Sequence, residues 1–227
     1  SYFGICDLAG LPKDRYWLYR SVWNRQDATL HVLPHWTWPG RKGKVTPVFV
    51  YTSYPSAELF VNGKSQGRIR KQKDSRLDRF RLRWNDVVYE PGEIKVVAYG
   101  EDGSVIGEQT IATAGEPTAM SLSSDRNTIN ADKDDMAFIE VSMTDAKGTF
   151  CPTLSDDLTF EVSGAGSFEA ACNGDATSLQ PFKQPEMKLF SGKAVVIVRS
   201  NGKRGRINLT VTNRQRNITK TITIEAR

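Results

Sequence analysis

The feature that most constrains the fold is a period of two in the apolar residues, which recurs from about residue 44 to the end of the sequence. In the stretch MAFIEVSMTD, for example, Ile139, Val141 and Met143 alternate with polar residues. Successive side chains of a strand point to opposite faces, so this pattern predicts half-buried β-strands. Helical spacing is absent from this long region. The sequence therefore predicts a mainly β protein.

Turn signals and a linker divide the predicted strands into two groups. Asn62-Gly63 marks a tight turn in the first group, and Asn201-Gly202 predicts a hairpin between GKAVVIVRS and GRINLTVT in the second. The segment AGEPTAM separates the groups. Short strands with frequent turns are typical of immunoglobulin-like sandwiches, so we expect two of them in tandem. The expected domains are residues 41–115 and 116–227, and the second contains a long irregular stretch at 173–190.

A single helix is predicted near the start, where Tyr16, Tyr19 and Trp23 fall in one row at helical spacing. Pro12 suits the first helical turn, because an N–H there has no intrahelical partner to lose. The broad apolar face needs a partner surface, and no second helix is predicted to supply one. Without that partner, we expect the helix to fold onto the first sandwich, to self-associate or to fray.

A net charge of +5 raises the question of nucleic-acid binding. Most of the excess lies between residues 64 and 83. There, Arg79, Arg81 and Arg83 alternate with apolar residues in RFRLRW. This alternation predicts a strand with one buried face and one solvated basic face. We therefore expect a basic surface and no nucleic-acid partner.

No residue pattern predicts a catalytic, metal or cofactor site. The sequence has no GxSxG, HExxH, CxxC or glycine-rich phosphate loop. The aspartate clusters in NADKDDM and LSDDL are typical of turns before strands. Cys151 and Cys172 either pair within one domain or stay as buried free thiols. No apolar stretch is long enough to insert into a membrane.

The stretch PHWTWPG has the one local pattern of a binding site. The indole faces of Trp36 and Trp38 suit the apolar faces of sugars, and His35 can bond a hydroxyl. These three residues are the candidate substrate-binding set. The alternative is that they pack where the helical segment meets the first sandwich.

The opening stretch FGICDLAGLPKDRYWLYRSVW resembles the end of the catalytic barrel in glycoside hydrolase family 2, the family of β-galactosidases and β-glucuronidases. The likeness is carried by Phe3, Gly4, Asp7, Gly10, Pro12, Lys13, Tyr16, Tyr19, Arg20 and Trp23. Further on, HVLPHWTWPG, VFVYTSYPSAELFVNGKSQG and WNDVVYEPGEIKVVAY resemble the sandwich that follows the barrel in Bacteroides-type β-galactosidases. VSGAGSFEAACNGDATSLQPFK and LFSGKAVVIVRS resemble their C-terminal bacterial immunoglobulin-like domain.

The resemblance implies that residues 1–40 are the last helix and exit segment of a (β/α)₈ barrel. The acid/base and nucleophilic glutamates of the family lie on earlier barrel strands, so neither maps to a residue of this sequence. The resemblance thus implies a C-terminal fragment of a retaining glycosidase, first of all a β-galactosidase. Its partners would be the upstream barrel of the same polypeptide and the carbohydrate substrate of that barrel. The fragment itself is expected to be inactive and to need no cofactor.

The resemblance also implies export to the periplasm or the cell surface. Two other functions stay open at this point. The aromatic set at 35–38 fits a stand-alone carbohydrate-binding module, and two tandem sandwiches fit an adhesin-like spacer that displays another domain.

Overall fold

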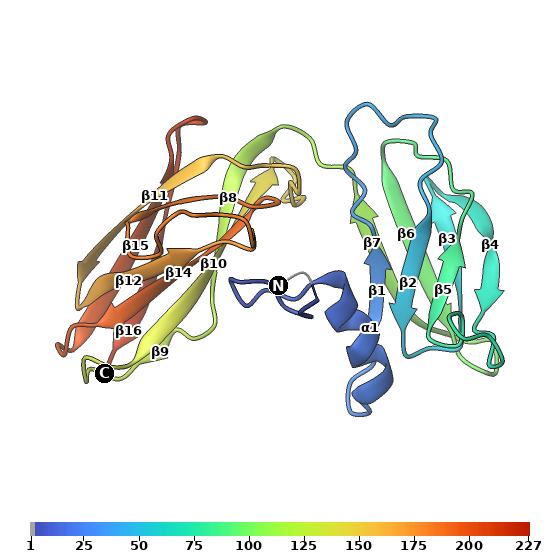
Figure 1. Ribbon diagram of the computed structural model, residues 1–227, viewed down its shortest axis with the longest axis horizontal. Coiled ribbons are helices and arrows are strands. Elements are labelled where there is room, and N and C mark those ends of the chain that lie inside the picture. The colour runs from blue at the N-terminus through green and yellow to red at the C-terminus, as the bar shows by residue number, and fades with distance from the viewer. Residues whose placement is uncertain (1–2) are drawn as a thin grey trace. The chain divides into compact units, whose positions relative to one another are not determined.

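The computed structural model describes residues 3–227, so the first two residues of the predicted 1–40 segment lie outside it. Within the described residues the chain has one helix, α1 (Asp14–Trp23), and sixteen strands (Figure 1). It divides into two compact units, of which one is Pro12–Thr113 and the other joins residues 3–11 to Ala114–Arg227. The prediction of a mainly β protein with two sandwiches and one leading helix is confirmed.

The first unit is a sandwich of a three-stranded sheet, in the order β1-β2-β5, and a four-stranded sheet, in the order β4-β3-β6-β7. Its strands are β1 (Leu30–Leu33), β2 (Val48–Thr52), β3 (Ser56–Val61), β4 (Lys64–Arg70), β5 (Arg81–Trp84), β6 (Glu93–Tyr99) and β7 (Val105–Ala112). Alternate residues of both sheets, such as Val50, Leu59 and Ile94, are fully buried between them. Asn62 and Gly63 have φ of 48° and 78° and join β3 to β4, as the turn signal predicts.

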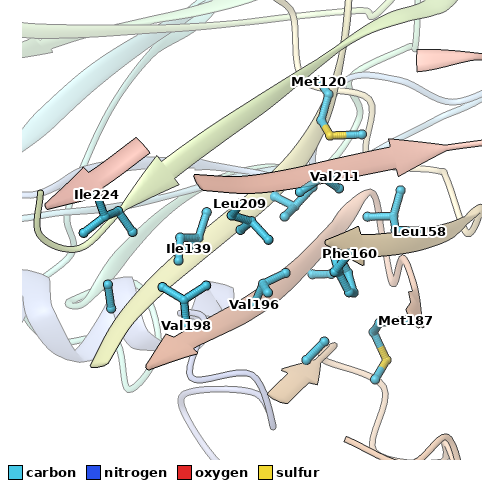
Figure 2. Packing of buried hydrophobic residues seen from close by; sticks show 14 of the residues in the cluster. Met120, Ile139, Leu158, Phe160, Met187, Val196, Val198, Leu209, Val211 and Ile224 are labelled. Carbon is cyan, nitrogen blue, oxygen red and sulfur yellow. The ribbon is translucent and has the colours of Figure 1, made fainter. Parts of the chain in front are cut away.

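The second unit pairs a four-stranded sheet, in the order β12-β14-β10-β8, with a five-stranded sheet, in the order β13-β11-β15-β16-β9. Its strands are β8 (Pro117–Ser124), β9 (Thr128–Ile129), β10 (Met136–Asp145), β11 (Asp157–Gly164), β12 (Gly166–Cys172), β13 (Glu186–Lys188), β14 (Lys193–Ser200), β15 (Gly205–Asn213) and β16 (Ile218–Ala226). Figure 2 shows Ile139, Val196 and Val198 of the first sheet packed with Leu209, Val211 and Phe160 of the second. The irregular stretch at 173–190 contains the short strand β13, which pairs with β11.

The predicted hairpin at Asn201-Gly202 is wrong. The strands on either side, β14 and β15, belong to different sheets, so the chain crosses from one layer of the sandwich to the other at this turn. Asn201 supports the crossing, because its backbone N–H donates to Ala165 O at 3.0 Å and its side chain donates to Gly164 O at 3.1 Å. Apolar residues of the two strands therefore face each other across the core instead of lying side by side.

Helix α1 begins at Asp14, two residues after Pro12, so the placement of Pro12 in its first turn is also wrong. Lys13 is the N-cap residue, and Asp14 puts a carboxylate in the first turn, where the helix dipole favours negative charge. The helix packs against β1 and β2 of the first unit. Of the three outcomes expected for it, the structure shows the first, in which the helix folds onto the first sandwich.

Candidate functional site

The predicted binding set lies in the loop that follows β1, and the structure keeps two of its members together while it buries the third in the core. Trp36 has no exposed surface. Its indole N–H donates to Glu90 O at 2.9 Å, and its ring makes an edge contact with Tyr89 at 4.9 Å between ring centroids. An indole that is fully buried cannot stack on a sugar, so Trp36 serves the core in this structure.

His35 and Trp38 stack on each other, with their ring centroids 4.1 Å apart and their planes 24° from parallel. The backbone N–H of Thr37 donates to His35 Nδ1 at 3.3 Å. Burial lowers the pKa of His35, against an opposing effect of the Asp14 carboxylate. The imidazole is therefore neutral near pH 7, with its proton on Nε2, where it can still donate to a hydroxyl.

Trp38 is partly exposed, and one face of its ring is already covered by His35. Its indole nitrogen is buried and, within residues 3–227, has no hydrogen-bond partner. The Arg41 guanidinium lies 5.8 Å from the ring centroid. The predicted sugar-binding role thus rests on the partly exposed side chains of His35 and Trp38, a smaller platform than three free side chains would make.

A second cluster, which the sequence reasoning missed, attaches α1 to the first sheet. His31 of β1 forms a contact of 2.8 Å between its Nε2 and Asp14 Oδ1, and its ring stacks on Trp17 at 5.1 Å between centroids. Arg20 of α1 donates to Thr29 Oγ1 at 2.7 Å. His31 and Asp14 stand seventeen positions apart on different elements, so their spacing in the sequence carries no sign of the pair.

The opposite side of α1 exposes apolar residues. Tyr19, Val22 and Trp23 keep 37%, 43% and 71% of their surface exposed, and the rings of Tyr19 and Trp23 lie 4.7 Å apart. These three residues form what we call the free face of α1. Helix α1 therefore has one side fixed to its sandwich and exposed apolar side chains on the other.

The predicted alternation along β5 is present, since Leu82 and Trp84 are buried and Arg81 and Arg83 lie partly exposed on the other face. Arg83 donates two hydrogen bonds to the Asp78 carboxylate, at 2.6 and 2.8 Å, and these bonds hold the pKa of Asp78 below its usual range. The Arg81 guanidinium lies 5.6 Å from the Phe49 ring centroid. Both side chains are partly buried, and only Arg79, which precedes the strand, is exposed. Two of the three arginines, Arg81 and Arg83, therefore pack against neighbours within the unit.

The first aspartate cluster forms a local turn, whereas Asp156 of the second accepts a hydrogen bond from the distant Asn213 at 2.9 Å. Asp132 Oδ1 accepts from the N–H groups of Asp134 and Asp135 at 2.9 and 2.8 Å, which is the predicted turn. No group of three potential metal ligands occurs among residues 3–227. Cys151 is a buried free thiol and Cys172 a partly buried one, and burial raises the pKa of both. Across the same residues, no helix has the length and apolar character that a membrane crossing needs.

Comparisons with known proteins match nearly the whole chain. Residues 120–221 match the family model for glycoside hydrolase family 2 C-terminal domain 5, and residues 43–107 match a model for a domain of unknown function. A β-galactosidase from Bacteroides ovatus is 42% identical over 94% of this chain. A putative β-glucuronidase from Formosa agariphila is 30% identical over 87% of it.

Solved structures of glycoside hydrolases share the fold of this chain. A β-glycosidase from Bacteroides vulgatus superposes with a TM-score of 0.90 at 35% identity, over 99% of this chain and 28% of its own. A family 2 glycosyl hydrolase from Bacteroides cellulosilyticus gives a TM-score of 0.89 at 27% identity, over 99% of this chain and 31% of its own. The chain spans only 24% of the Bacteroides ovatus protein and 19% of the Formosa agariphila protein. It therefore corresponds to a small part of its relatives.

Proposed function

We propose that this chain, which belongs by its sequence and its fold to the C-terminal region of glycoside hydrolase family 2, is the non-catalytic part of a retaining β-galactosidase. Its two sandwiches brace a catalytic barrel that precedes them in the same polypeptide, and they border the carbohydrate cleft of that barrel. The preference for β-galactosidase follows the Bacteroides ovatus relative, which is more similar to this chain than the Formosa agariphila β-glucuronidase is.

The observation that carries the proposal is the two-sided character of α1. One side is fixed to the first sandwich by Asp14, Trp17 and Arg20. The other side is the free face of Tyr19, Val22 and Trp23. In the longer relatives three quarters or more of the polypeptide lies outside the matched region, which leaves ample chain to cover this face.

The chemistry itself belongs to the upstream barrel. Retaining glycosidases use two carboxyl groups about 5 Å apart, one as nucleophile and one as acid/base. In a (β/α)₈ barrel such groups stand at the ends of the barrel strands. We therefore expect the 227-residue chain alone to hydrolyse no aryl β-galactoside, and the longer polypeptide to hydrolyse it.

The test is Trp23→Ala in the longer polypeptide. Removing an aromatic side chain from a packed contact costs about 3 kcal/mol. We expect the temperature at which β-galactosidase activity is lost to fall by several degrees, with kcat/KM unchanged well below that temperature. The matched control is Leu77→Ala, because Leu77 is an apolar residue of the same unit with 53% of its surface exposed, in the connection between β4 and β5.

Equal thermal loss for the two variants would contradict the bracing role of α1. If the longer polypeptide hydrolysed aryl β-glucuronides and not β-galactosides, only the sugar assignment would be wrong. A secreted or periplasmic location remains part of the proposal, supported by the resemblance alone. It is checked by fractionating cells that express the longer polypeptide.

The aromatic loop supports a second candidate function, sugar binding by this chain itself, because His35 and Trp38 are stacked and partly exposed. The test is a titration of the chain with galactose and glucuronic acid, followed by tryptophan fluorescence, with Trp38→Ala as the control variant. A change at millimolar sugar that disappears in Trp38→Ala would support binding. No change would remove this candidate.

A further inference from the structure

We propose that the outer face of the sheet β12-β14-β10-β8 is a second docking surface for the upstream part of the same polypeptide. This inference rests on the proposed function, because both need an upstream domain. It concerns a different unit, however, and other residues than those of α1 and the aromatic loop.

The outer face of this sheet is apolar at its centre. Phe138 of β10 lies opposite Ile197 of β14, and Val195 of β14 lies opposite Cys172 of β12. The residues that alternate with them, such as Ile139 and Val196, point into the core between the sheets. A strand that is apolar on both faces is typical of a sheet covered on both sides.

The chain itself covers part of this outer face. Val195 keeps only 5% of its surface exposed although it lies outside the core cluster. Together with Phe138 it lines a shallow hollow whose other wall is formed by Ala9, Gly10 and Leu11. The segment at 9–11 therefore lies on the sheet.

Asp7 gives that segment a defined shape and position. Its Oδ1 accepts from the backbone N–H groups of Ala9 and Leu11, each at 2.9 Å. Its carboxylate also lies so close to Gly174 that a side chain there would collide with it. The segment is thus held against the loop that follows β12.

Much of the apolar surface around this contact is uncovered. Phe138 is 45% exposed and Leu8 of the segment is 51% exposed. Charged pairs stand beside it on the same sheet, with 2.6 Å between Glu140 Oε1 and Lys193 Nζ and 2.8 Å between Arg199 Nε and Glu169 Oε2. An apolar centre with a polar rim is the usual composition of a protein interface.

The upstream part of the polypeptide is the occupant that these observations favour. The matched region is 24% of the Bacteroides ovatus relative and 28% of the Bacteroides vulgatus structure, so a large preceding part is expected. That part would be joined to residues 3–11, and residues 9–11 already lie on the outer face of the sheet β12-β14-β10-β8. A short tether gives an effective concentration in the millimolar range, well above that of a second free copy.

The experiment places the photocrosslinking residue p-benzoylphenylalanine at position 138 of the longer polypeptide, with the same residue at position 221 as the control. Thr221 is an exposed residue on the outer face of the other sheet of the same sandwich. After irradiation of an equal mixture of ¹⁴N- and ¹⁵N-labelled protein, crosslinked peptides are identified by mass spectrometry. We expect position 138 to crosslink to peptides upstream of Ser1 within one molecule, and position 221 not to.

Crosslinks from position 138 that join ¹⁴N to ¹⁵N chains would overturn the inference in favour of self-association. Crosslinks from position 138 confined to this sequence, or none, would overturn it as well. A third site at position 23, on the free face of α1, separates the two proposals. If position 23 reaches upstream peptides and position 138 does not, only the second docking surface fails. If neither does, the proposed bracing function fails too.

Discussion

On the outer face of the five-stranded sheet, threonines of β15 and β16 lie opposite one another, with Thr210 and Thr221 joined at 2.9 Å and Thr212 and Thr219 at 3.2 Å. On the outer face of the four-stranded sheet of the same sandwich, the corresponding layer holds Phe138, Val195 and Ile197. The inner faces of the two sheets are alike, since both are apolar and buried.

This difference is the one expected if one outer face contacts water and the other contacts a protein partner. A water-facing sheet needs β-formers with hydroxyl groups, and threonine supplies them. A partner-facing sheet gains from apolar groups that would be a liability in water. The same contrast recurs on α1, where Trp17 is stacked on His31 and Trp23 is 71% exposed.

The largest effect is expected from Ile139→Ala, which opens a cavity in the core and costs about 3 kcal/mol. Ile139 has no exposed surface, whereas its neighbour Phe138 faces outward, so Phe138→Ala in this chain should cost about 0.5 kcal/mol or less. All five tryptophans lie in the first unit, so amide hydrogen exchange in β10 is the measurement to use. Equal losses for the two variants would contradict the assignment of opposite faces.

The second prediction compares the two sides of α1. Trp17→Ala removes the ring stacked on His31 and should destabilise the first unit of this chain by about 2 kcal/mol. Trp23→Ala in the same chain should change its stability by less than about 0.5 kcal/mol, because the side chain is largely exposed. Urea unfolding followed by tryptophan fluorescence measures both. A larger loss of stability for Trp23→Ala than for Trp17→Ala would contradict the assignment of Trp17 to the side of α1 that packs on the first sandwich.

The third prediction uses pH to test the charged rim. Hydrogen bonding to Arg199 lowers the pKa of Glu169 to about 2, from an ordinary value of 4.5. Because the folded-state pKa is depressed, the stabilisation is complete above pH 4.5 and is lost as the pH falls towards 2. Glu169→Gln should therefore cost about 1 kcal/mol at pH 7, since the pair is partly exposed to solvent, and almost nothing near pH 2.

Hydrogen exchange at several pH values, measured on the two proteins side by side, checks this prediction. Glu161→Gln is a suitable control, because Glu161 is an exposed residue on the other sheet and should show little change at any pH. A cost of Glu169→Gln that did not vary with pH would contradict the charged-pair account.

The smallest effect is expected from Thr221→Ala. This residue lies on the threonine face and is exposed, so its replacement should change stability by less than about 0.5 kcal/mol, both in this chain and in the longer polypeptide. A cost that appeared only in the longer polypeptide would show that the threonine face is also covered. The contrast between the two sheets would then disappear.

Most of the strands could be predicted from the sequence, because their alternation is local. The stretch from Met136 to Asp145 and the turn at Asn62-Gly63 are examples. The turn at Asn201-Gly202 has the same local signal and a different outcome, because only the packing of the two sheets decides whether the chain returns to the same sheet or crosses to the other.

The parts of the site that sequence reasoning missed depend on contacts between distant residues. The pair of His31 and Asp14 joins a strand to a helix, and no sequence motif predicts this contact. Tryptophan is the residue type expected on an exposed sugar-binding surface, and only the structure shows that Trp36 is buried. One signal was present in the sequence, however. The stretch KAVVIVRS has apolar residues at both parities, which indicates a strand covered on both faces.

The most direct test of the account is hydroxyl-radical footprinting of the 227-residue chain and of the longer polypeptide, read by mass spectrometry. Trp23 and Phe138 are exposed in this chain and should be oxidised readily, and both should become protected in the longer polypeptide. Leu77, an exposed apolar residue that belongs to neither proposed surface, should be oxidised equally in the two. Equal oxidation of Trp23 and Phe138 in the two proteins would contradict the claim that these sandwiches brace an upstream domain.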